Sequence, residues 1–201
     1  MSDWIDNIIS AWTGHRKFAE WLVNTTKSDV IVELGVDYGF STFVFANALK
    51  NTNGVIYGID LFIGDAHTGE RDMYNVVMNS ITEHNVENIQ IVRGDFTTIS
   101  KIWSKPINIL HIDGLHTHEA VKNDFVCWSK HVNDDGIILF HDTAITEYGF
   151  GVKDFFRELS GGYKLYFTHS AGLGIFTKNV ELYNKILNSF DNVFDFEKNP
   201  F

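Results

Sequence analysis

Two short segments of the chain combine aspartate with histidine directly after a run of branched apolar residues. They are DGLH at residues 113–116 and HDT at residues 141–143. If the two runs form neighbouring parallel strands, Asp113 and Asp142 lie side by side at one edge of a sheet. Adjacent carboxylates repel and raise each other's pKa unless a cation lies between them. The pattern therefore predicts a site for a hard divalent metal such as Mg²⁺, held by oxygen atoms.

A glycine-bearing turn follows another apolar run, in VELGVDYGFST at residues 32–42. Gly35 would let the backbone turn sharply and approach a ligand, and Gly39 would admit the N-terminus of the following helix. The spacing G-x-x-x-G lacks the G-x-G-x-x-G of dinucleotide-binding proteins, which argues against a nicotinamide-dependent oxidoreductase. Glu33 can face the ammonium group of a ligand, directly or through water. The alternative is a solvent-facing acid in a tight turn.

Aspartates end two further runs. Asp60 comes 25 residues after Gly35, where its carboxylate can accept both hydroxyls of a ribose. Asp95 can accept a hydrogen bond from an adenine amino group while Phe96 packs alongside the ring. Each aspartate alone is more often an ordinary loop acid. Together they form a row of acids at successive strand ends, where open α/β sheets bind their ligands.

The elements that must position these residues alternate between short runs rich in Val and Ile and segments of helical length. This alternation is typical of an α/β fold with a parallel sheet. A helix and two strands joined by a small turn follow the fifth run, and a hairpin requires antiparallel strands. We expect strands at 30–34, 55–59, 89–92, 107–112, 137–140, 163–168 and 172–177, and helices at 41–50, 73–84, 117–131 and 152–159.

This ordered set resembles the class I S-adenosylmethionine-dependent methyltransferases over about residues 28–178. The resemblance implies a Rossmann-like, seven-stranded, mostly parallel sheet with a terminal antiparallel hairpin and helices on both faces. It also implies S-adenosylmethionine as cofactor, with contacts from Glu33, Gly35, Asp60 and Asp95. Gly39, in the same glycine turn as Gly35, is a further candidate cofactor-binding residue.

The DGLH and HDT segments resemble the macrocin-type O-methyltransferases, also called the methyltransferase domain 24 family. This resemblance implies that Asp113 and Asp142 bind magnesium and that His116 is the general base, so that Asp113 and His116 carry the catalysis. His141 stands where related enzymes often carry an acid. It is therefore a third candidate ligand, suited to a softer ion, or a hydrogen-bonding partner. His111 and His118 are interpreted as structural or surface groups.

The expected chemistry is transfer of a methyl group to a hydroxyl of a small molecule such as a sugar. An alcohol must lose its proton as it attacks the sulfonium methyl group, and a nearby imidazole can accept that proton at neutral pH. A different class of function uses the same fold: a nucleotide- or cofactor-binding module in which Asp113 and His116 do no chemistry.

Composition limits the partners. The 201 residues carry a formal net charge of −10, from 26 acidic and 16 basic side chains, which disfavours nucleic acids and anionic membranes as partners. Cys127 is the single cysteine, so no intramolecular disulfide can form, as is typical of a reducing cytoplasm. The acidic N-terminus lacks the basic region of a signal peptide, and no apolar stretch approaches the roughly 20 residues of a membrane span. We expect a cytoplasmic protein.

Apolar residues at helical spacing predict that residues 1–28 are helical and pack on the same single domain, 1–201, or cover the active site as a lid. Residues 65–74, flanked by Gly64, resemble a mobile loop that closes over the acceptor. The Phe-rich tail, 190–201, either lies on the core or contacts a second copy of the chain in a homo-oligomer.

Overall fold

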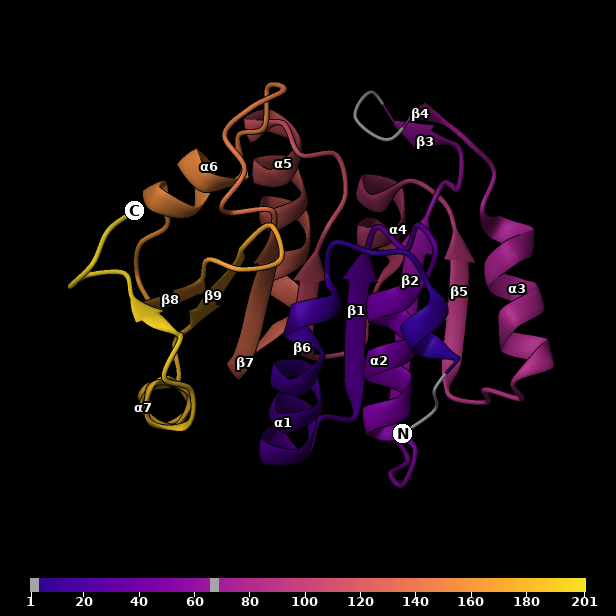
Figure 1. Ribbon diagram of the computed structural model, residues 1–201, viewed down its shortest axis with the longest axis horizontal. Helices are drawn as coiled ribbons and strands as arrows, with labels where there is room; N and C mark the ends of the chain where they lie inside the picture. Colours follow the sequence, from indigo (N-terminus) through magenta and orange to yellow (C-terminus); the bar gives the residue numbers. More distant parts are fainter. Residues whose placement is uncertain (1–3, 66–68) are drawn as a thin grey trace.

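The computed structural model describes residues 4–65 and 69–201, and its centre is one eight-stranded sheet (Figure 1). The strand order is β10-β8-β9-β7-β6-β1-β2-β5. The strands are β1 (Val30–Leu34), β2 (Val55–Asp60), β5 (Ile89–Arg93), β6 (Ile107–Ile112), β7 (Val132–His141), β8 (Tyr163–Phe167), β9 (Leu173–Thr177) and β10 (Phe194–Asp195).

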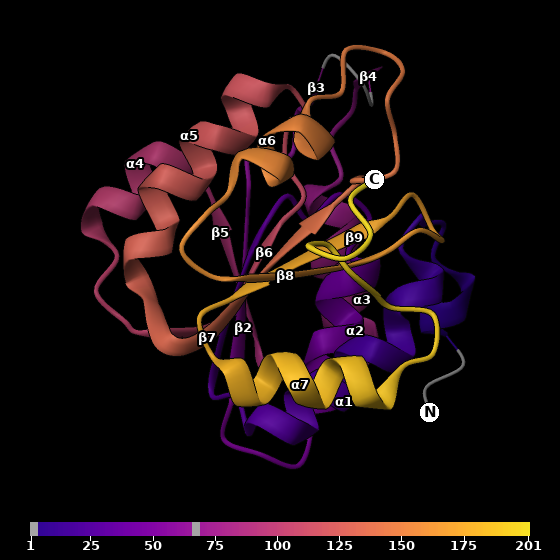
Figure 2. The same ribbon diagram turned by 90° about the vertical axis from the view of Figure 1, so that its left-hand side faces the viewer.

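Most of this sheet is parallel. Strand β1 pairs in parallel with β2 and β6, which pair in parallel with β5 and β7 respectively. Strand β9 runs antiparallel to both β7 and β8, and the β8–β9 hairpin lies near one end of the sheet (Figure 2). The predicted fold class is confirmed.

The predicted number of seven strands is wrong, because the sheet has an eighth strand. Residues 194–195, in the Phe-rich tail, add β10 antiparallel to β8. Two residues are too few to show the alternation of apolar and polar side chains by which a strand is recognised. A separate small hairpin, β3 (Gly64–Asp65) with β4 (Gly69–Glu70), occupies part of the segment interpreted as a loop. Residues 66–68 of that segment lie outside the described residues.

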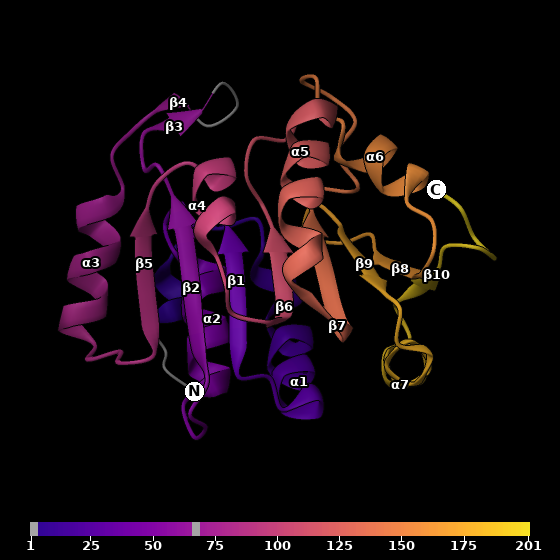
Figure 3. The ribbon, with the colours of Figure 1, turned by 180° about the vertical axis from the view of Figure 1, so that it is seen from behind.

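Helices cover both faces of the sheet, as predicted (Figures 1 and 3). One face packs against α1 (Arg16–Thr26), α2 (Phe40–Leu49), α3 (Tyr74–Glu83) and α7 (Val180–Ser189). The other packs against α4 (Phe96–Ile102), α5 (His118–Trp128) and α6 (Val152–Glu158). The sequence patterns do not predict α4 and α7. Within the described residues, no helix is long and apolar enough to cross a membrane.

Strand β1 shows how the two layers bury the centre of the sheet. Ile31, Val32, Glu33 and Leu34 have no exposed surface. Ile31 packs into the core beneath α1 and α2, whereas Val32 and Leu34 pack into the core beneath α5. Because successive side chains of a strand point to opposite faces, Glu33 points to the same face as Ile31. A polar, ionisable side chain is thereby placed inside the protein.

The N-terminal segment, residues 4–26, is helical in part. It contains two short 3₁₀ helices, η1 (Ile5–Asn7) and η2 (Thr13–His15), before α1. Trp12 is fully buried, and α1 packs along α2. The segment lies on the α2 side of the sheet and joins its core. A third 3₁₀ helix, η3 (Ser129–His131), follows α5.

The Phe-rich tail lies against the sheet and α6. Phe196 and Phe201 pack on Phe156, with ring centroids 5.8 and 6.0 Å apart, and Phe201 also packs edge-on against Tyr166 at 4.4 Å. These contacts match the first of the two interpretations of the tail, in which it covers the core.

Trp128 offers a test of the packing between α5 and the sheet. Its side chain is fully buried and its indole N–H donates to the Phe96 carbonyl oxygen at 3.1 Å. Trp128→Ala should lower the free energy of unfolding by about 3–5 kcal/mol, because it leaves a cavity and removes this hydrogen bond. Val126→Ala, in the same helix at a position 62% exposed, should change it by less than about 0.5 kcal/mol. Urea unfolding followed by circular dichroism measures both, and equal losses would contradict the described core.

Candidate active site

A cavity of about 170 Å³ opens where the parallel strands end. It lies between the loops that follow β1, β2, β5 and β6, at the carboxyl edge of the sheet, as is typical of open α/β folds. Five predicted site residues line it: Gly35, Asp60, Asp95, Asp113 and His116. Sequence reasoning missed Asp37, Leu61, Phe62 and Leu115, which also line the cavity. Two further lining residues, Arg71 and Met73, belong to residues 65–74, the segment expected to close over the acceptor.

The glycine turn brings two strand ends into close approach. Gly35 has φ of 95° and Gly39 has φ of 85°, a conformation that favours glycine. A Cβ at Gly35 would collide with the carbonyl oxygen of Asp113, at the end of β6. Gly39 precedes α2 and packs against the ring of Phe43. Gly35 is therefore needed for the approach of β6 to the turn.

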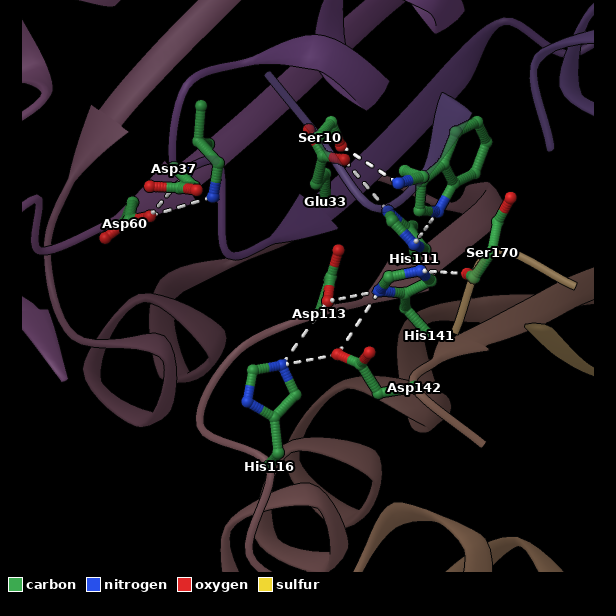
Figure 4. A network of polar contacts seen from close by, with 12 residues as sticks. Ser10, Glu33, Asp37, Asp60, His111, Asp113, His116, His141, Asp142 and Ser170 are labelled. Carbon is green, nitrogen blue, oxygen red and sulfur yellow. Dashed lines mark hydrogen bonds and ion pairs between the residues drawn. The ribbon is translucent and has the colours of Figure 1, made fainter. Parts of the chain in front are cut away.

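Asp60 ties the glycine turn to the end of β2. One carboxylate oxygen accepts from the backbone N–H of Val36 at 2.8 Å and of Asp37 at 3.2 Å (Figure 4). The other accepts from the N–H of Phe62 at 2.7 Å. The side chain thus holds two loops together while it lines the cavity. These bonds fix the position from which it would meet a ligand.

Asp95, like Asp60, both makes structural hydrogen bonds and lines the cavity. Its carboxylate caps α4 by accepting from the backbone N–H and the hydroxyl of Thr98, both at 2.8 Å. Asp95 and the neighbouring ring of Phe96 both line the cavity. The predicted acid and aromatic ring therefore lie together.

Glu33 lies elsewhere. It is completely buried on the α2 face, where it accepts from the hydroxyl of Thr42 and, at 2.9 Å, from Nδ1 of His111. The indole N–H of Trp12 donates to the other ring nitrogen of His111 at 3.1 Å, so the His111 proton is on Nδ1. The structure does not bring Glu33 to the cavity, nor does it expose Glu33 to solvent. The Glu33–His111–Trp12 contacts instead anchor the N-terminal segment to the sheet.

The ends of β6 and β7 bring Asp113, His141 and Asp142 together. Nδ1 of His141 lies 3.2 Å from Asp113 Oδ1 and 3.3 Å from Asp142 Oδ2. One ligand atom from each of the three residues lies within 4.8 Å of the other two. Figure 4 shows both carboxylates directed at the same side of the His141 ring. This cluster is the group of described residues that could hold a metal ion.

The orientation of His141 makes the cluster require a positive charge. Its Nε2 faces the carbonyl oxygen of Ser170 at 3.0 Å, and a carbonyl only accepts, so Nε2 carries a proton. In the neutral ring, Nδ1 would then present a lone pair to two carboxylates. Either a proton on Nδ1 or a metal ion resolves this repulsion. The donor set, two carboxylate oxygens and an imidazole nitrogen, fits a divalent cation.

The electrostatics agree with this geometry. Burial would lower the pKa of His141, but the charges and hydrogen bonds of Asp113 and Asp142 outweigh it and raise the pKa well above its usual value. Burial would raise the pKa of Asp113 and of Asp142, yet the neighbouring histidines hold both below the ordinary value. Without a metal, a proton therefore occupies the space between the carboxylates.

His116 approaches the same carboxylates from the other side. Its Nε2 lies 2.8 Å from Asp142 Oδ2 and 3.6 Å from Asp113 Oδ1, and its ring stacks on Phe150 with centroids 4.4 Å apart. Burial would lower its pKa, but hydrogen bonding to the two aspartates raises it from 6.5 to about 9. In the absence of a metal, His116 holds a proton at neutral pH.

Asp142 adopts a strained backbone conformation to reach this position. Its φ is 61°, in the left-handed region that few residues other than glycine adopt. Such residues cluster at functional sites and persist where the surrounding structure holds them. The turn directs the carboxylate toward His116 and His141, away from the continuation of β7.

The β3–β4 hairpin borders the cavity and is tied to the glycine turn. Arg71, which follows β4, forms an ion pair with Asp37 at 2.7 Å, and its guanidinium lies 5.1 Å from the ring centroid of Tyr38. Arg71 and Asp37 both line the cavity. The N-terminal segment, expected either to pack or to form a lid, contributes none of its described residues to the cavity lining.

Comparison with protein families gives one match over this region. The family described as "Methyltransferase domain" matches residues 32–143, which contain the glycine turn, Asp60, Asp95 and the Asp113–Asp142 cluster. An uncharacterized protein of Sinorhizobium fredii is 35% identical over 175 residues, covering 83% of this chain. The chain spans only 19% of the length of that relative.

Solved structures share the fold at low sequence identity. The O-methyltransferase TomG from Streptomyces achromogenes, in complex with S-adenosylmethionine, has a TM-score of 0.66 and 14% identity, covering 88% of this chain and 90% of its own. An O-methyltransferase from Bacillus cereus in complex with S-adenosylhomocysteine has a TM-score of 0.64 and 15% identity, covering 82% and 81%. The arrangement of helices and strands is therefore one that such enzymes use.

The raised pKa of His116 predicts how stability depends on pH in the metal-free protein. A histidine whose pKa rises from 6.5 to about 9 on folding stabilises the fold fully below pH 6.5 and loses this contribution as pH rises through about 9. The free energy of unfolding in the presence of a chelator should therefore fall between pH 6.5 and 9, and His116→Gln should flatten this fall. Urea titrations across that range measure it. Parallel pH profiles for the two proteins would contradict the assigned His116 contacts.

Proposed function

Because the chain belongs to the methyltransferase-domain family, whose match covers residues 32–143, we propose that it transfers the methyl group of S-adenosylmethionine to a hydroxyl of a small molecule such as a sugar, assisted by a divalent cation. The observation that carries this proposal is the cluster of Asp113, His116, His141 and Asp142, of which Asp113 and His116 line the cavity. Acids, imidazoles and a ligand cavity meet at one point of a fold that is shared with O-methyltransferases.

The other end of the cavity supports S-adenosylmethionine as the methyl donor. Asp60 is the acid for the ribose hydroxyls, and Asp95 with Phe96 is the contact for adenine. Gly35 leaves room for the ligand beside the turn. The S-adenosylmethionine and S-adenosylhomocysteine complexes of the two similar structures support the same ligand for this fold.

A divalent cation would be held by Asp113, Asp142 and Nδ1 of His141. Carboxylate oxygens suit Mg²⁺, whereas an imidazole nitrogen is better suited to transition-metal ions such as Mn²⁺. The direction of His141 Nδ1 toward the two carboxylates supports such an ion, since the ion would replace the proton that otherwise separates these groups.

When bound, S-adenosylmethionine supplies an electrophilic methyl group and the cation lowers the pKa of the acceptor hydroxyl. His116 then accepts the hydroxyl proton on Nε2, the ring atom directed at the cluster. It can do so only after losing the proton that Asp113 and Asp142 stabilise. A cation bound to these aspartates would neutralise their charge and so favour the loss of that proton. Phe150 stacks on the His116 ring and holds its plane fixed. The products are the methyl ether, S-adenosylhomocysteine and a proton.

Cofactor binding is tested at Asp60. Asp60→Asn removes the negative charge that would accept both ribose hydroxyls, and charged hydrogen bonds contribute about 1.5–3 kcal/mol. The Kd for S-adenosylmethionine should rise on the order of 10- to 100-fold. Asp134→Asn, an exposed position at the opposite end of β7, is the matched control and should bind like the wild type. Isothermal titration calorimetry measures the three constants. Wild-type affinity in Asp60→Asn would refute this ribose contact.

Catalysis is tested at His116. Its replacement by Gln should lower kcat by about 10²–10⁴-fold, because general-base catalysis is lost, while the affinity for S-adenosylmethionine is retained. The assay measures S-adenosylhomocysteine formed from a panel of sugars and phenols with Mg²⁺ or Mn²⁺. Turnover by the wild type that His116→Gln retains in full would exclude this base. Binding of S-adenosylmethionine without turnover on any acceptor would favour a non-catalytic binding module.

A further inference from the structure

The turn between β8 and β9, residues 169–172, lies directly against the proposed metal site. The Ser170 carbonyl oxygen accepts from Nε2 of His141 at 3.0 Å and from Nε2 of His15 at 3.2 Å. Figure 4 shows Ser170 beside His141, on the side of the ring away from Asp113 and Asp142. One backbone carbonyl thus contacts a residue of the cluster and a residue of the N-terminal segment.

This turn has a backbone that needs support. Ser170, Ala171 and Gly172 follow one another with φ of 50°, 65° and 87°. Two of the three are not glycine, and such residues hold the left-handed conformation only where surrounding contacts maintain it. The carbonyl that faces His141 therefore depends on contacts from outside the turn.

The N-terminal segment supplies these contacts. The backbone N–H of Gly14 donates to the Ser170 hydroxyl at 3.1 Å, and Nε2 of His169 lies 3.2 Å from the Gly14 carbonyl oxygen. On the other side, the N–H of Ala144 donates to the Ala171 carbonyl oxygen at 2.9 Å. The turn is held between the N-terminal segment and the loop that follows Asp142.

Burial of the His15 side chain is energetically unfavourable. It has no exposed surface, and its Nδ1 has no hydrogen-bond partner, whereas its Nε2 contacts Ser170. A buried polar atom without a partner is unfavourable, so an apolar ring of similar size would serve packing better. The contact with the Ser170 carbonyl is what an apolar ring would not provide.

The N-terminal segment is itself anchored to the centre of the sheet. Trp12 donates to His111, which in turn contacts Glu33 on β1, and all three side chains are buried. A continuous series of polar contacts therefore runs from β1 through residues 12–15 to Ser170 and His141.

We propose that Ser170 and His15 are positioning residues for the metal site, which fix the His141 ring so that Nδ1 faces Asp113 and Asp142. This inference rests on the proposed function, because it concerns the metal site of that function. Groups that orient a metal-binding histidine through its second ring nitrogen typically change metal affinity 10- to 100-fold when they are removed. The N-terminal segment acts from behind His141, without contacting the cavity.

The experiment compares two serines that each accept one backbone N–H of the N-terminal segment. The Ser170 hydroxyl accepts from Gly14 at 3.1 Å and the Ser10 hydroxyl accepts from Trp12 at 3.0 Å, but only Ser170 contacts His141. Binding of Mn²⁺ to the full chain is measured by electron paramagnetic resonance. We expect Ser170→Ala and His15→Phe to weaken Mn²⁺ binding about 10-fold or more, His15→Gln to restore part of it through its amide N–H, and Ser10→Ala to bind like the wild type.

A second readout separates this inference from the metal site itself. In chelator-treated protein labelled with ¹⁵N-histidine, the Nε2–H of His141 should exchange slowly with solvent in the wild type and in Ser10→Ala, and faster in Ser170→Ala. If this holds but the wild type binds no Mn²⁺, the support of His141 stands and the proposed metal function fails. Unchanged exchange and Mn²⁺ affinity in Ser170→Ala would overturn the inference. So would equal losses in Ser10→Ala, since they indicate a purely structural role.

Discussion

Asp113 and Asp142 stand at the ends of neighbouring strands and share the Nδ1 side of His141, at 3.2 and 3.3 Å. Two carboxylates in a largely buried site are stable only with positive charge between them. In the metal-free protein this charge is a proton on each of His141 and His116, whose pKa values the carboxylates raise. A divalent cation at the same place would displace those protons and leave His116 able to act as a base. Under the proposed function, protonation of the site and binding of a metal would therefore be one coupled equilibrium.

The scaffold is built to hold this arrangement. Parallel pairing of β6 with β7 places the two aspartates at one edge, and the left-handed backbone of Asp142 directs its carboxylate back toward the histidines. Gly35 lets the β1 turn approach the end of β6, and Asp60 fixes that turn to the end of β2 by accepting from the backbone N–H groups of Val36 and Asp37. The cavity between these loops then joins the acid–histidine cluster to the proposed cofactor contacts. Residues that would bind the ligand, such as Asp60, therefore also hold the loops around the cavity together.

Residues that follow directly from strand order could be predicted from the sequence. Parallel strands end at one edge, so the aspartates after β2, β5, β6 and β7 had to gather there, and the fold class followed from the alternation of strands and helices. Glu33 could not be placed this way, because a shift of one residue along a strand decides which face its side chain occupies. The role of Ser170 could not be predicted from the sequence, since its contacts with His15 and His141 join segments 155 and 29 residues apart. Short strands such as β10 contain too few residues to show the alternation of apolar and polar side chains.

The central claim is that a metal ion and protons compete for Asp113 and Asp142. Calorimetric titration of Mn²⁺ or Mg²⁺ at neutral pH, repeated in buffers of different ionisation enthalpy, tests it most directly, because the dependence of the heat on the buffer counts the protons released. The account predicts binding accompanied by proton release, lost in Asp142→Asn. Binding without proton release, or no binding by the wild type, would contradict it.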